Sequence, residues 1–180
     1  NYIDSSERII TIEDVRELNL RQAHVVSLET KSSNYDGIGE VTIRDLVRNS
    51  LRMRPDRIIV GEVRGSEAFD MLQAMNTGHD GSLTSLHANS SKDALNRLET
   101  MVLMDGIDIP VNAIREYINN ALDIVVHITR LKDGRRKVTD ISEIVDVKNN
   151  EIILKNIFKY KSDGILENGI VTGEYVLQEY

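Results

Sequence analysis

Short apolar runs rich in β-branched residues alternate with amphipathic helical patterns along the first part of the chain. Strands of a parallel sheet are apolar on both faces, and the run RIIVG at Arg57–Gly61 has this character. The alternation predicts an α/β fold with a largely parallel sheet flanked by helices. The strands are expected at Arg8–Glu13, His24–Leu28, Arg57–Gly61 and Ser82–Leu86.

Segments with apolar residues at helical spacing lie between and after these strands. The first is expected to end at Pro55, because proline cannot continue a helix. We expect Ser66 to cap the second helix and Pro110 to begin the last one. The predicted helices are Thr42–Met53, Glu67–Asn76, Lys92–Met104 and Val111–Leu122.

The rhythm changes after Leu122, where three apolar runs follow one another without a helix between them. Asp133-Gly134 and Asn149-Asn150 separate the runs, and such pairs favour tight hairpin turns. The predicted antiparallel strands are Asp123–Thr129, Lys137–Val147 and Glu151–Tyr160, with one or two weak strands beyond Lys161. We therefore divide the chain into a core, residues 1–122, and a β-hairpin extension of the same domain, residues 123–180.

Composition excludes several classes of protein. The 180 residues contain no cysteine, which excludes a disulfide scaffold, a Cys-ligated metal site and a thiol nucleophile. The formal net charge of −7 is unlike that of a dedicated nucleic-acid binder, so no nucleic-acid partner is expected. No apolar run approaches the roughly 20 residues of a membrane helix, and the polar start NYIDSSER is no signal peptide. These features predict a soluble, cytoplasmic protein.

Carboxylates follow two of the predicted strands, at the ends where α/β folds place their ligand crevices. Glu13 and Asp14 end the first strand, within ITIEDVREL, and Glu62 follows RIIVG. A carboxylate there can polarise a water or hold a cation, and an apolar strand that delivers one acid is the Walker B arrangement. Two structural alternatives stay open: Glu13 and Asp14 as an ordinary polar strand end, and Glu62 as a cap of the following helix.

Two histidines lie eight residues apart in TGHDGSLTSLHANS. His79 follows a helix stop, and His87 comes just after a predicted strand, where an imidazole can donate a hydrogen bond to a phosphate oxygen. Their spacing is not that of a helical metal-binding pair. The alternative is purely structural, with one histidine on the surface and one satisfied in the core.

Arginines are dense in the middle of the chain, with six inside 21 residues: Arg44, Arg48, Arg52, Arg54, Arg57 and Arg64. The first three are spaced i, i+4 and i+8, so they share one face of a helix. A solvated face is the simplest explanation. The alternative is that some of them reach phosphate oxygens, also across a subunit boundary as arginine fingers.

Together, these segments resemble the C-terminal ATPase domain of the type II/type IV secretion and pilus motor superfamily. ITIEDVREL resembles its Asp box, RPDRIIVGEVRG its Walker B motif and TGHDGSLTSLHANS its His box, in the family's order and spacing. The sequence between these motifs is most similar to the CpaF-like branch, the assembly ATPases of tight-adherence (Flp) pili. The resemblance runs from about Glu7 to Met104 and weakens afterwards.

The resemblance implies a RecA-like core that binds ATP and Mg²⁺. The residues implied in catalysis are Glu13, Asp14, Glu62 and His87. Glu13 would activate the attacking water with support from Asp14, Glu62 would hold Mg²⁺ through water, and His87 would contact the γ-phosphate. His79 is expected to support the nucleotide site from further away. The remaining cofactor-binding candidates, as charge stabilisers or interface residues, are Arg54, Arg57 and Arg64.

One family motif is missing from the sequence: no G-x-x-x-x-G-K-[ST] phosphate loop occurs, and no glycine is followed by lysine. We therefore expect a fragment that starts after the P-loop strand and helix and that alone has almost no ATPase activity. Because the missing strand is normally central, neighbouring strands should lose partners. The isolated chain is then expected to fill that gap or to self-associate.

For the parent protein, the resemblance implies a cytoplasmic hexamer at the inner face of the cell membrane, docked on an inner-membrane platform protein. It would couple ATP hydrolysis to the export of pilin or another substrate. Three alternatives stay open: a type IV secretion motor, a non-catalytic interaction module, and a nucleic-acid motor that uses the basic cluster Arg130, Lys132, Arg135, Arg136 and Lys137. The net charge opposes the last of these.

Overall fold

The structure is a computed structural model that describes residues 2–104, 106, 108–166 and 169–178. The chain divides into two compact units, one made of residues 1–87 and 98–110, the other of residues 88–97 and 111–180. The proposed division into a core, residues 1–122, and an extension, residues 123–180, stays a prediction. None of the described helices is both long and apolar enough to cross a bilayer.

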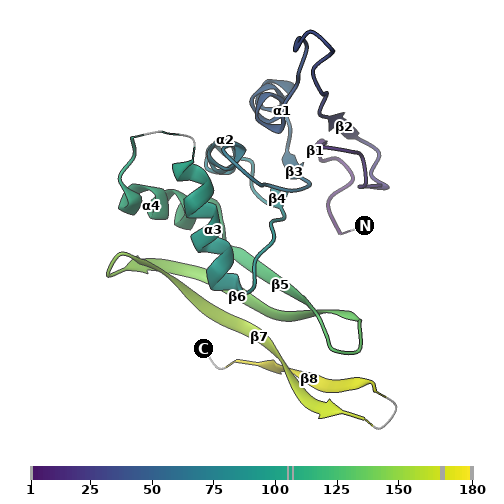
Figure 1. Cartoon of the computed structure of the whole chain (residues 1–180), viewed down its shortest axis with the longest axis vertical. Helices are drawn as coiled ribbons and strands as arrows, with labels where there is room; N and C mark the ends of the chain where they lie inside the picture. Colours follow the sequence, from purple (N-terminus) through teal and green to yellow (C-terminus); the bar gives the residue numbers. More distant parts are fainter. Residues whose placement is uncertain (1, 105, 107, 167–168, 179–180) are drawn as a thin grey trace. The chain divides into compact units, whose positions relative to one another are not determined.

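The first unit is built on a four-stranded parallel sheet with the order β2-β1-β3-β4 (Figure 1). Its strands are β1 (Ile9–Glu13), β2 (Val25–Glu29), β3 (Arg57–Val60) and β4 (Leu83–Thr84). The predicted strands and their parallel arrangement are confirmed, although β4 is only two residues long. The α/β fold class with an additional antiparallel sheet is likewise confirmed.

Strand β1 is buried along its whole length. Ile9, Ile10 and Ile12 have no exposed surface, so β1 contributes apolar side chains to both faces of the sheet. Ile58 and Val60 continue this core along β3. Helix α1 (Ile43–Ser50) packs against β1 and β2, which fixes the sheet from one side.

Helix α1 begins at a capping box in which Thr42 and Asp45 accept hydrogen bonds from each other's backbone N–H groups. A 3-10 turn (Leu51–Met53) extends it, and Arg54 ends it in the left-handed conformation, just before Pro55. Helix α2 (Glu67–Met75) starts differently from the prediction, because Ser66 has helical backbone angles and its side chain caps nothing. The Ser66 cap was therefore wrong.

Helix α3 (Ser91–Leu103) contributes to both units. In the second unit, helix α4 (Val111–Ala121) packs on an antiparallel sheet with the order β5-β6-β7-β8. The strands are β5 (Ile124–Arg130), β6 (Arg136–Lys148), β7 (Glu151–Ile165) and β8 (Val171–Leu177). All the hairpin strands predicted beyond Leu122 are confirmed, including one in the tail. Asn149 and Asn150 both adopt positive φ, as the tight turn between β6 and β7 requires.

Asp133, in the turn between β5 and β6, joins that turn to the start of β8. Its Oδ2 accepts hydrogen bonds from the Arg135 side chain at 2.6 Å and from the backbone N–H of Val171 at 2.8 Å. The hydrogen bond from Arg135 and those from the two backbone N–H groups lower the pKa of Asp133 to about 2 from its ordinary 3.8. The folded chain therefore favours the ionised carboxylate.

This contact predicts an acid-sensitive attachment of β8. The pKa of Asp133 is lower in the folded chain than in the unfolded chain. The ionised carboxylate therefore contributes fully to the stability of the fold above about pH 4, and this contribution is lost as the pH falls towards 2. Asp133→Asn should flatten the fall of the thermal unfolding midpoint between pH 4 and pH 2. Asp163→Asn, an exposed aspartate on β7, is the matched control. Identical pH profiles for Asp133→Asn and the unmodified chain would contradict the attachment.

Candidate functional site

Two acids and one histidine from the sequence motifs lie at the carboxyl ends of the parallel strands. Glu13 is the last residue of β1, Glu62 comes two residues after β3, and His87 follows β4. Since the strands run parallel, these ends share one edge of the sheet, where α/β proteins place their ligands.

Glu13 is buried, with 5% of its surface exposed. Its Oε1 accepts hydrogen bonds from the backbone N–H groups of Glu17 and Leu18, each at 3.0 Å. Its Oε2 is buried and has no hydrogen-bond partner in the described part of the chain. Glu13 thus holds the turn after β1 with one oxygen and keeps the other available, an unusual state for a buried carboxylate.

Gly61 allows β3 to approach Glu13 closely. Its backbone N–H donates to the Ile12 carbonyl at 2.8 Å, and a Cβ placed on Gly61 would lie 3.0 Å from Cγ of Glu13. Any larger residue would therefore push against the Glu13 side chain. The glycine of the Walker B-like motif therefore allows the ends of β1 and β3 to lie close together.

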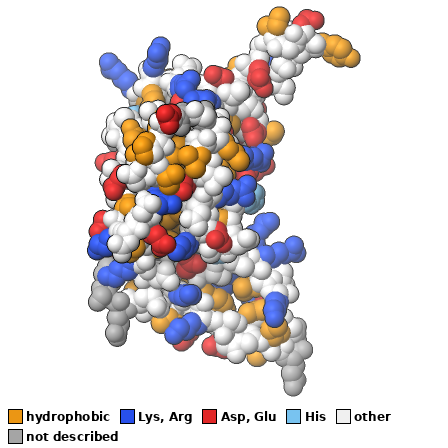
Figure 2. All heavy atoms as spheres, turned by 60° about the vertical axis from the view of Figure 1, so that its left-hand side comes forward, with side chains coloured by type: hydrophobic (Ala, Val, Ile, Leu, Met, Phe, Trp, Pro, Cys, Tyr) orange, Lys and Arg blue, Asp and Glu red, His pale blue; other side chains and the backbone are white. Residues whose placement is uncertain are grey.

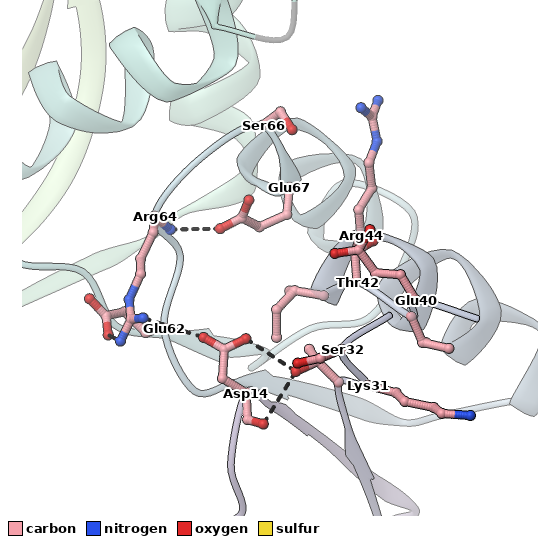
Figure 3. Close-up of a pocket in the computed structure, with 13 residues that line it drawn as sticks. Asp14, Lys31, Ser32, Glu40, Thr42, Arg44, Glu62, Arg64, Ser66 and Glu67 are labelled. Atoms are coloured by element: carbon pink, nitrogen blue, oxygen red, sulfur yellow. Dashed lines mark hydrogen bonds and ion pairs between the residues drawn. The ribbon is translucent and has the colours of Figure 1, made fainter. Parts of the chain in front are cut away.

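A chain of ion pairs joins the three motifs at this edge, and Figure 3 shows its Asp14, Arg64 and Glu62 members. Arg64 contacts Glu62 at 2.5 Å and Asp14 at 3.4 Å, and His87 Nε2 lies 3.3 Å from Glu62 Oε1. The hydrogen bond that Arg64 donates to the Glu62 carboxylate raises the pKa of Arg64 above its ordinary value, so this guanidinium stays charged. The Glu62 carboxylate is largely covered, whereas the His87 imidazole is mostly exposed to solvent.

Glu67 holds the turn that precedes helix α2. Its Oε1 accepts hydrogen bonds from the backbone N–H groups of Arg64 at 2.6 Å and Gly65 at 3.0 Å. The Glu62 carboxylate forms ion pairs with Arg64 and His87, and its role as a helix cap stays an open alternative.

A cavity of about 480 Å³ opens beside this network (Figure 3). Asp14, Glu62 and Arg64 form one wall, and Thr30 Oγ1 donates to the Asp14 carbonyl at 3.2 Å. Arg44, one of the arginines singled out from the sequence, also lines the cavity. Sequence reasoning missed the other lining residues from the segments after β2 and at the start of α1 and α2: Thr30, Lys31, Ser32, Glu40, Thr42, Ser66 and Glu67. They carry no motif of their own, and only their position next to the strand ends marks them.

Three predicted cofactor-binding residues do not lie at this edge. Arg57 starts β3, at the opposite end of the sheet, and binds Glu7 at 2.9 Å and the Gly81 carbonyl at 2.5 Å. His79 comes before β4, and its Nδ1 lies 2.9 Å from the Ala74 carbonyl at the end of α2. Arg54 is exposed where it ends the α1 segment. Their observed contacts are structural, and an interface role for Arg54 or Arg57 stays a prediction.

Two of the aligned arginines have a role that the sequence did not suggest. Arg44 and Arg48 both contact the buried carboxylate of Asp70 on α2, each at 2.6 Å. This pairing ties α1 to α2, and both arginines are needed because a buried charge without partners is costly. Arg44 also lines the cavity. The contacts of Arg44 and Arg48 with Asp70 therefore hold α1 against α2 and fix the position of Arg44 in the wall of the cavity.

The site suits a cation reached through water better than one bound directly. Both Glu62 oxygens already have protein partners, and no group of three metal-ligating side chains occurs among the described residues. A Mg²⁺ ion with its own waters needs only one or two carboxylates. Glu62, which lines the cavity, fits this requirement.

Fold and site define an α/β protein with the architecture of secretion ATPases. The VirB11 ATPase from the Brucella suis type IV secretion system is similar, with a TM-score of 0.69 and 38% identity over 78% of this chain and 41% of that one. The pilus retraction motor PilT shares the fold, with a TM-score of 0.52 and 24% identity.

The chain belongs to the family described as Type II/IV secretion system protein, which matches residues 1–165. The conjugal transfer protein TrbB of Rhizobium radiobacter is 34% identical over 87% of this chain and 45% of its own length. The type IV secretion system protein PtlH of Bordetella pertussis is 40% identical over 77% of this chain and 42% of its own. The chain thus spans less than half the length of these relatives.

The Glu13 geometry predicts a specific local effect. Glu13→Ala removes the acceptor of two backbone N–H groups, so the amides of Glu17 and Leu18 should exchange with solvent about tenfold faster. Glu13→Gln keeps an acceptor oxygen and should leave both amides protected. Amide exchange followed by NMR distinguishes the two variants. Equal protection in Glu13→Ala and the unmodified chain would show that another group holds this turn.

Proposed function

We propose that this chain is the C-terminal part of a motor ATPase that powers a type IV secretion or conjugal transfer apparatus. Family membership and the relatives TrbB, PtlH and VirB11 support this choice. The observation that carries it is the ion-pair chain Asp14–Arg64–Glu62–His87, which links the segments that resemble an Asp box, a Walker B motif and a His box at one end of the sheet.

Each residue then has a role that follows from its contacts. Glu13 is pinned through Oε1, so its free Oε2 can accept a proton from an attacking water. Glu62 would hold a Mg²⁺ ion through that ion's waters, and such an ion would neutralise charge on the phosphates of ATP. His87, exposed and adjacent to Glu62, donates to the terminal phosphate and responds to its loss.

Arg64 acts on this site through its two carboxylate partners. Its charge compensates Glu62 and Asp14, which lets several acids share one crevice. Asp14 in turn fixes Arg64 relative to β1. We assign Arg64 a positioning role, and Asp14 a supporting role beside Glu13.

The proposed function requires a phosphate cradle, and the 180 residues contain no P-loop motif. Reading the coding sequence upstream of Asn1 tests this directly. An in-frame G-x-x-x-x-G-K-[ST] supports a motor ATPase, and a stop codon directly upstream would favour a non-catalytic interaction module.

For the assembled motor, we propose a hexamer on the cytoplasmic face of the inner membrane, with Mg²⁺-ATP bound between neighbouring subunits and a membrane platform protein as partner. The mutual similarity of secretion motors in this family supports it. No nucleic-acid partner is proposed, because the net charge is −7.

Assembly of a tight-adherence pilus is the second candidate for the transported system. Two sequence segments between the motifs support this candidate, because they are similar to the tight-adherence branch: GIGEVTIRDLVRNSLRM and EAFDMLQAMNTGHDGS. Deleting the gene distinguishes the two systems. Loss of substrate secretion or conjugal transfer with normal pili supports the first candidate, and loss of surface pili alone supports the second.

The proposed role of Glu62 gives a direct prediction. In the full-length protein, Glu62→Gln should reduce the ATP hydrolysis rate by about 100-fold or more, since it removes a charge beside the developing phosphate charge. Glu116→Gln, which changes an exposed acid on α4, should have no effect. Steady-state phosphate release measures both. An unchanged rate in Glu62→Gln would remove this carboxylate from the catalytic site.

A further inference from the structure

The segment between β2 and α1 forms an ordered arm. A backbone pair between Lys31 and Val41, at 2.9 and 2.8 Å, closes its base. At its tip, Asn34 Oδ1 accepts hydrogen bonds from the backbone N–H groups of Asp36 at 3.0 Å and Ile38 at 2.9 Å. The arm is therefore folded by its own hydrogen bonds, without support from a helix or sheet.

This arm presents apolar side chains to water. Tyr35 is fully exposed and Ile38 is 68% exposed, and the tip lies at the top of Figure 1, where Figure 2 shows hydrophobic and acidic side chains on a projecting segment. Aromatic and aliphatic side chains on a preorganised loop are typical of an interaction element, because little conformational entropy is lost on binding. Residues 32–40 carry two acids, Asp36 and Glu40, and no basic residue.

A surface of opposite charge exists on the same chain. The hairpin Arg130–Lys137 contains five basic residues and a single acid, Asp133. Lys132 and Arg136 are exposed and have no ion-pair partner in the described structure. Beside them on β5, Val126 and Ile128 are 51% and 58% exposed. This basic hairpin thus offers charge and apolar contacts that match the arm tip.

We propose that the arm of one copy docks on the basic hairpin of a second copy, with Tyr35 and Ile38 against the exposed aliphatic side chains of β5 and Asp36 beside Lys132 and Arg136. Two different surfaces meet, so the contact is head-to-tail and repeats from copy to copy, as a ring requires. The proposal goes beyond the proposed function and rests on it only in assuming self-assembly. Lys31, Glu40 and Val41, at the base of the arm, also line the cavity. Docking of the arm would therefore couple the conformation of the cavity in one subunit to the neighbouring subunit.

Reciprocal charge reversal in the full-length protein tests the contact. Asp36→Arg alone and Arg136→Glu alone should each weaken self-association by about tenfold, because like charges then face each other. The double variant Asp36→Arg/Arg136→Glu should recover association to within about twofold of the unmodified protein. Glu116→Arg, a charge reversal on α4, is the matched control and should have no effect. Sedimentation velocity over a concentration series measures all four.

Tyr35→Ala separates docking from folding. It removes only an exposed ring, so the thermal midpoint should stay unchanged while self-association weakens. Normal association in both Tyr35→Ala and Asp36→Arg would overturn the proposal. Weakened association that the double variant fails to recover would show that the arm binds a different surface, and would overturn the assigned partner.

Nucleotide hydrolysis measured on the same proteins keeps the two proposals apart. If charge reversal is rescued although the full-length protein hydrolyses no ATP, the arm contact stands and the motor function fails. If ATP is hydrolysed and the rescue fails, the motor function stands and the arm contact is wrong.

Discussion

The backbone N–H of Gly61 donates to the Ile12 carbonyl at 2.8 Å, and this bond sets the parallel register in which β3 ends beside β1. The close approach needs a glycine, because a Cβ would lie 3.0 Å from Cγ of Glu13. Everything at the candidate site follows from it. Asp14 and Arg64 are 50 residues apart in the sequence, and this register brings their side chains to 3.4 Å.

Most of the charged side chains near this end of the sheet are paired with groups of opposite charge or with backbone N–H groups. Arg64 lies between two carboxylates, Glu67 is occupied by backbone N–H groups at the start of α2, and Asp70 is held by two arginines. Against this background, the buried Glu13 oxygen without a partner stands out. The other acids at this edge are compensated, and this buried acceptor is the observation behind the proposed role of Glu13 as a water-activating base.

Sequence patterns predicted the parallel sheet, the antiparallel hairpins and the acids at the strand ends, because apolar runs and turn residues are local signals. They did not predict the contacts of Arg44 and Arg48 with Asp70, since these depend on which helix faces which. The roles expected of Arg57 and His79 stay predictions. Each belongs to a motif by position, yet each lies at the amino end of its strand, away from the crevice.

The account depends on one claim: the crevice at the ends of β1, β3 and β4 receives the phosphates of ATP. An experimental structure of the full-length protein with Mg²⁺ and a non-hydrolysable ATP analogue measures this most directly. The account predicts the terminal phosphate in hydrogen-bond reach of His87, with Glu13 facing the position of the attacking water and Glu62 contacting a Mg²⁺-bound water. A nucleotide bound elsewhere, with the Asp14–Arg64–Glu62–His87 chain intact and remote from it, would contradict the account.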